Sequence, residues 1–128
     1  MITNENDLDT KLMEDMEPQL FNFLKTGVNS FIKCDLVRFF HENSTTADTA
    51  DDIARYAGRA QADIEKELID LVDVGILDQE LVGEMSVFSL ATDQTTRELI
   101  EQFVLACNDR RFRIKVIYHI IQKMEALV

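Results

Sequence analysis

The stretch that most constrains the fold is residues 53–77, IARYAGRAQADIEKELIDLVDVGIL. Apolar residues recur there every three or four positions, which is the period of helices that bury one face. Gly58 separates two such runs, and Gly75 follows the second run. Glycine adopts backbone conformations that are costly for other residues, so Gly58 predicts a tight turn between two helices. The pattern predicts a short helix over residues 50–57 and a second over about 61–74.

Signals on both sides of this stretch predict the remaining elements. The runs ILDQEL (76–81) and SVFSLA (86–91) flank the turn VGEM and are typical of two paired strands. Pro18 suits the first turn of a helix. The chain has only this one proline and four glycines, which favours long helices over loops. The outer helices are expected at about residues 18–26, 30–43, 92–107 and 110–128, so the fold is predicted to be mainly α.

This order of elements resembles the winged helix-turn-helix of small bacterial transcription regulators of the MarR and ArsR type. The resemblance is carried by IARYAG, then Ile64 and Leu68, then LVDVGIL, with VFSLA similar to the return strand of the wing. It covers roughly residues 30–91 and implies a two-stranded β-hairpin wing. The helical patterns outside this range predict extra N- and C-terminal helices around the winged-helix core. The sequence departs from the pattern at Arg59, where an apolar residue usually fills the turn. It also departs at Ala60, where serine or threonine usually caps the second helix.

A chain of 128 residues with 46% hydrophobic residues can bury one core, so a single domain is expected. The expected parts are a polar tail (1–7) and one winged-helix domain (8–128), which comprises an N-terminal helical extension (8–27), a winged helix-turn-helix core (28–91) and C-terminal helices (92–128).

The last helix carries a wide apolar stripe beside basic residues. Its basic stretch RRFRIKVIYHIIQK can in principle hold an acidic partner, a nucleic-acid backbone or a membrane surface. We favour a packing helix with a solvated basic edge, because the stripe is wide enough for a core and a partner. The outer helices are predicted to form a homodimer, because the winged-helix core alone cannot cover so much apolar helix surface. The stripe consists of Ile114, Ile117, Tyr118, Ile121 and Met124.

The resemblance implies a DNA-binding transcription regulator, in which the second helix of the motif enters the major groove. Side chains at the start of that helix then contact bases, and nearby arginines contact phosphates. The implied base-contacting residues are Gln61, Ala62, Glu65 and Lys66, and the implied phosphate-contacting residues are Arg55 and Arg59.

The charge of residues 45–91 favours a different function from DNA binding. Residues 45–91 hold three basic and eleven acidic residues, in a chain of net charge −11. Binding to DNA depends on Lys and Arg at the phosphates. Lys66 and Asp70 are one helical turn apart and can pair. The alternative is an acidic interaction module that binds a basic protein surface or mimics nucleic acid. The partner-binding face of this alternative is Asp63, Asp70, Asp73 and Glu84.

Several other classes find no support in the sequence. It has no phosphate-binding glycine loop, nucleophile elbow or zinc-protease motif, so neither an enzyme nor a cofactor is predicted. No apolar run reaches the roughly 18 residues of a membrane span. The acidic start differs from a signal peptide, and two thiols fit a reducing compartment, so a cytoplasmic location is expected. No metal site is predicted, because no recognised ligand spacing links Cys34, Cys107, His41 and His119.

Overall fold

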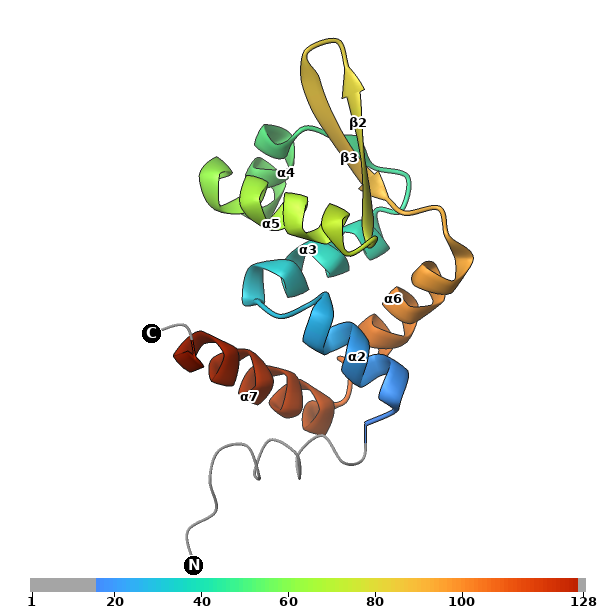
Figure 1. Cartoon of the computed structure of the whole chain (residues 1–128), viewed down its shortest axis with the longest axis vertical. Helices are drawn as coiled ribbons and strands as arrows, with labels where there is room; N and C mark the ends of the chain where they lie inside the picture. Colours follow the sequence, from blue (N-terminus) through green and yellow to red (C-terminus); the bar gives the residue numbers. More distant parts are fainter. Residues whose placement is uncertain (1–15, 127–128) are drawn as a thin grey trace, which may run out of the picture.

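The computed structural model describes residues 16–126, which form six helices and a small three-stranded antiparallel sheet (Figure 1). The prediction of a mainly helical fold is confirmed. The helices are α2 (Pro18–Thr26), α3 (Phe31–Glu42), α4 (Ala50–Ala57), α5 (Gln61–Asp73), α6 (Gln94–Ala106) and α7 (Arg110–Ala126). The strands are β1 (Ala47–Asp48), β2 (Leu77–Val82) and β3 (Met85–Leu90). The predicted polar tail lies outside the described residues.

Local signals place α4 and α5 where the sequence predicts them. The Thr49 hydroxyl caps α4 by accepting a hydrogen bond from the backbone N–H of Asp52 at 3.3 Å. Gly58 follows α4 with φ 67° and ψ 34°, the left-handed conformation that glycine adopts without strain. Ala60 precedes α5 and provides no side-chain cap. The start of α5 therefore leaves backbone N–H groups without a capping side chain, as the departure at Ala60 predicts.

The sheet contains one strand that the sequence does not predict. We expected a polar loop before α4, but β1 lies within it and pairs with β3, with Ala47 opposite Ser89. The strand order is β1-β3-β2. A two-residue strand has no periodicity of its own, and pairing with β3 defines it. The β2–β3 hairpin is also longer than predicted, because its strands extend to Val82 and Met85 and the loop is only Gly83 and Glu84.

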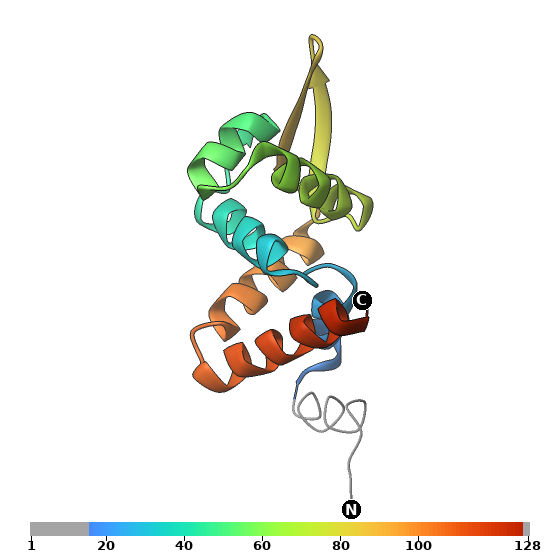
Figure 2. The same cartoon turned by 90° about the vertical axis from the view of Figure 1, so that its left-hand side faces the viewer.

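Buried side chains from every helix and from β2 and β3 form one continuous core. The β2–β3 hairpin, α4 and α5 lie at one end of the molecule, α3 lies in the middle, and α2, α6 and α7 lie at the other end (Figures 1 and 2). The completely buried large side chains are Leu24, Leu36, Phe40, Ile53, Ile64, Leu68, Leu71, Phe103 and Ile120. No described helix has both the length and the apolar character needed to cross a membrane.

Helix α7 faces the core with a different side from the one that the sequence favours. Phe112, Val116 and Ile120 are its buried apolar residues, and the Phe112 ring packs edge-on against Phe103 with centroids 5.9 Å apart. Tyr118, in the predicted stripe, is half-buried. The helix carries two apolar stripes, and periodicity alone does not say which one meets the core. The other four residues of the predicted stripe are exposed: Ile114, Ile117, Ile121 and Met124.

Candidate functional site

A cleft of about 510 Å³ lies between the start of α4, the start of α5 and the β2–β3 hairpin. We call it the acidic cleft, because its lining contains four carboxylates and no basic side chain. The lining residues are Thr49, Ala50, Asp51, Asp52, Gln61, Glu65, Glu84, Met85, Ser86 and Phe88.

Three elements meet at this cleft for reasons that are local in the sequence. The Thr49 cap fixes the beginning of α4, so the first-turn residues Asp51 and Asp52 lie at its rim. The tight turn at Gly58 brings the start of α5, with Gln61 and Glu65, to the same opening. The hairpin closes the remaining side. Its two-residue loop therefore brings a residue distant in sequence, Glu84, to the same surface as α5.

The acidic residues near the cleft influence one another. The pKa of Asp48, in β1, is raised by burial and then by the charge and hydrogen bond of Asp52. A like charge close to a carboxylate disfavours its ionised form. The Asp52 carboxylate therefore adds to burial in disfavouring the ionised form of Asp48.

We expect Asp48→Asn to stabilise the protein at pH 7 by less than about 1 kcal/mol. The raised pKa means that folding favours neutral Asp48. This advantage is complete below the ordinary pKa of 3.8 and is lost as the pH rises through the raised value. Asparagine stays neutral at every pH, so the gain should disappear near pH 3. Urea unfolding at both pH values measures it, with Asp73→Asn on exposed α5 surface as the control. Equal midpoints at pH 7 would contradict the prediction.

The two arginines predicted to contact phosphates are already bound to carboxylates. The Arg55 guanidinium lies 2.7 Å from Asp51 and 3.8 Å from Asp52, and the Arg59 guanidinium lies 2.6 Å from Asp35 on α3. Neither arginine lines the acidic cleft. A phosphate would have to compete with these carboxylates for both guanidinium groups.

Four of the residues predicted at the start of α5 lie on its exposed side, at two neighbouring hollows. Gln61 and Glu65 line the acidic cleft. Ala62, Glu65 and Lys66 line a shallower hollow of about 390 Å³ together with Ile69 and Asp70. Within residues 16–126 Lys66 has no ion pair, although its spacing from Asp70 permits one. Asp70 binds a different lysine.

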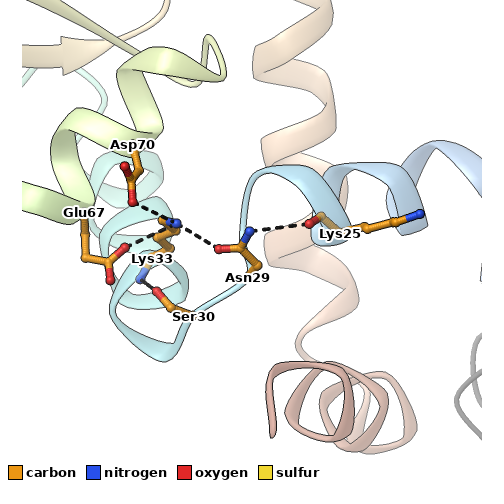
Figure 3. Close-up of polar contacts among 6 residues, drawn as sticks. All are labelled: Lys25, Asn29, Ser30, Lys33, Glu67 and Asp70. Atoms are coloured by element: carbon orange, nitrogen blue, oxygen red, sulfur yellow. Dashed lines mark hydrogen bonds and ion pairs between the residues drawn. The ribbon is translucent and has the colours of Figure 1, made fainter. Parts of the chain in front are cut away.

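The lysine that pairs with Asp70 is Lys33, a largely buried residue of α3 that connects α3 to α5 (Figure 3). Its Nζ donates to Asn29 Oδ1 at 2.8 Å and lies 3.3 Å from both Glu67 and Asp70. The Lys33 side chain is only 11% exposed and that of Glu67 only 17%. Two of the acidic residues of α5 therefore help to hold this helix, and one of them is Asp70, which the alternative prediction places on the partner-binding face. Asn29 also donates to the Lys25 carbonyl at 3.5 Å.

The other predicted partner residues divide between the cleft and the open surface. Glu84 lines the acidic cleft, whereas Asp63 and Asp73 are exposed on α5 and line neither hollow. The sequence reasoning missed Asp51 and Asp52, which the cleft adds. It also missed Lys33, although one signal was present: Lys33 shares the helical register of the buried residues Leu36, Val37 and Phe40. A charge in a buried register predicts an internal partner.

The cysteines behave as core residues. Burial raises the pKa of the Cys34 thiol to about 12, and the charges of Cys107 and Asp35 act in the same direction. Burial likewise raises the pKa of Cys107. Both thiols therefore remain protonated near neutral pH and are weak nucleophiles. Among residues 16–126, no group of three or more His, Cys, Asp or Glu side chains is placed to hold a metal ion.

Comparison with known proteins assigns the chain to no family. The sequence matches no protein-family model and no curated protein.

Proposed function

We propose that the chain is a non-enzymatic winged-helix interaction module whose acidic cleft binds a basic segment of another protein. The observation that carries the proposal is the composition of the cleft. Four carboxylates line it, no basic side chain does, and Glu65 and Glu84 have no ion pair within the described residues. A Lys- or Arg-rich segment would supply the missing positive charge.

The winged-helix part of the proposal rests on the order and connection of the elements. Helices α3, α4 and α5 are followed by the β2–β3 hairpin, and the turn between α4 and α5 is tight because of Gly58. In this arrangement α5 corresponds to the recognition helix, and the hairpin corresponds to the wing. The acidic cleft then occupies the angle between recognition helix and wing.

Exposed apolar side chains beside the carboxylates support a protein partner. Met85 lines the cleft and is 58% exposed, and Ile69 on the outer side of α5 is 40% exposed. Leu81 and Val82 near the hairpin tip are more than half exposed. Protein interfaces combine a buried apolar centre with a polar rim. We therefore expect the bound segment to carry apolar side chains among its basic ones.

Charge reversal in the cleft tests the proposal. We expect a fluorescent oligolysine peptide to bind the full chain, with affinity that falls between about 50 mM and about 200 mM salt. Glu65→Lys combined with Glu84→Lys should weaken binding by about tenfold or more, because two unpaired carboxylates are replaced by cations that repel the oligolysine peptide. Fluorescence anisotropy measures both effects.

The matched control is Glu98→Lys combined with Glu101→Lys on the exposed surface of α6, which changes the net charge by the same amount. This control should retain most of the affinity. Equal losses in the two double variants would show that the peptide responds to the net charge of the protein and not to the cleft, and would overturn the proposal.

A second candidate function is DNA binding by the same α5 surface. The observation that favours it is Lys66, which is exposed at the start of the proposed recognition helix and has no ion pair within the described residues. Fluorescent mixed genomic DNA fragments at about 50 mM and about 200 mM salt provide the test. Salt-sensitive binding that Lys66→Glu abolishes would support DNA binding by the α5 surface. Absence of binding even at low salt would leave the interaction module.

A further inference from the structure

Helix α7 has a second apolar face that points away from the core. Its residues Ile114, Ile117 and Ile121 are 49%, 45% and 41% exposed, and Met124 is 54% exposed. We call these four residues the outer stripe. Helix α7 lies at the end of the molecule opposite the β2–β3 hairpin in both views (Figures 1 and 2). The outer stripe is therefore remote from the acidic cleft and needs a separate explanation.

The spacing within the outer stripe is that of a coiled-coil seam. Its members follow one another by three, four and three residues, the a and d positions of a heptad repeat. An isolated exposed isoleucine is ordinary, but an aligned set over three helical turns is typical of a helix that packs against another helix. The core residues Phe112, Val116 and Ile120 occupy other heptad positions. The outer stripe is therefore additional to the packing of α7 within its own chain.

We propose that a second copy of this chain docks on the outer stripe, so that two α7 helices pack antiparallel about a two-fold axis. With the axis near the level of residue 119, Ile117 packs against Ile121 of the second copy. Ile114 packs against Met124 of the second copy. Each apolar layer is then filled by two large side chains, and the same patch serves on both chains, as an isologous dimer requires.

The charges on α7 specify this orientation. Residues 111, 118 and 125 share the heptad position that flanks the seam on one side, and such positions face each other in antiparallel pairs. Arg111 then lies opposite Glu125 of the second copy, at both ends of the interface. In a parallel pair Arg110, which continues the seam one layer before Ile114, would lie against Arg110 of the second copy. The distribution of charge thus favours a second copy in the antiparallel orientation.

Sedimentation velocity of the full chain between about 1 µM and about 100 µM tests the assembly. We expect a reversible monomer–dimer equilibrium, because a single helix pair forms a small interface. Ile117→Glu combined with Ile121→Glu should leave a monomer throughout this range. Its thermal midpoint should match that of the wild-type monomer, because both positions are exposed in the monomer. A wild-type protein that is monomeric at every concentration, or a double variant that still dimerises, would overturn the proposal.

A charge exchange tests the orientation. Arg111→Glu alone and Glu125→Arg alone should each weaken the dimer, and the two together should restore it. Lys123→Glu, which changes a charge of α7 outside the seam, should have little effect. If each single variant weakens the dimer and the double variant does not restore it, the antiparallel orientation is overturned. A monomeric wild type whose thermal midpoint falls with Ile117→Glu would assign the stripe to another segment of the same chain. The outcome is independent of peptide binding to the acidic cleft.

Discussion

Replacing Lys33 with methionine should lower the free energy of unfolding by about 3 kcal/mol. The substitution keeps the length of the side chain but removes the cation that lies 3.3 Å from both Glu67 and Asp70. Asp70 is 41% exposed and regains water, whereas Glu67 is 17% exposed and stays largely buried without a partner. An uncompensated buried carboxylate is costly. The loss is large against a total stability of about 5–15 kcal/mol for a domain.

Urea unfolding measures the change, and two further variants isolate its cause. Lys66→Met removes an exposed lysine of α5 and should change stability by no more than about 0.5 kcal/mol. Glu67→Met added to Lys33→Met should recover much of the loss, since well-packed apolar residues often replace a buried ion pair without cost. A Lys33→Met protein that unfolds at the wild-type urea concentration would show that the network does not hold α5.

Phe103→Ala should destabilise the protein by about 3–5 kcal/mol. The Phe103 side chain is completely buried and joins three helices: its ring centroid lies 5.7 Å from that of Phe23 on α2 and 5.9 Å from that of Phe112 on α7. Alanine leaves a cavity between helices whose partial collapse cannot restore both contacts. Since Phe112 is among the few buried residues of α7, this helix should lose protection from hydrogen exchange first.

Leu105→Ala is the matched control for that experiment, because Leu105 lies on the same helix and is 58% exposed. Its effect should stay within about 0.5 kcal/mol. Similar losses of stability for the two variants would mean that the cluster around Phe103 contributes no more than the surface of α6.

Most of the architecture follows from local signals in the sequence. Thr49, Gly58 and Gly75 mark where α4 and α5 begin or end, and alternating patterns predict both strands of the hairpin. Signals of this kind act within a few residues, so the boundaries agree closely with the structure. The strand β1 could not be predicted in this way, because a two-residue strand depends on β3, about forty positions away in the chain.

The candidate site was predictable in position but not in its pairing of charges. The sequence places Glu65 and Lys66 in the first turns of α5 and Glu84 in the loop of the β2–β3 hairpin. It does not show that Arg59 binds Asp35, or that Asp70 pairs with Lys33, because each pair joins segments that are far apart in the sequence. Short-range rules such as a pairing of Lys66 with Asp70 compete with these longer contacts. The choice between them depends on burial, which favours the partner that is already desolvated.

Gly27 limits how the chain can be divided. An added Cβ at this position would lie 2.7 Å from Ile76 Cδ1 and 3.0 Å from the Phe23 carbonyl oxygen. The turn after α2 therefore packs closely against Ile76, the residue that precedes β2. A fragment cut at residue 28 would uncover Ile76 and lose Leu24 from the common core. Helix α2 and the segment from α3 to β3 consequently share one core, and the segment from α3 to β3 should not keep its packing when it is transferred alone into another protein.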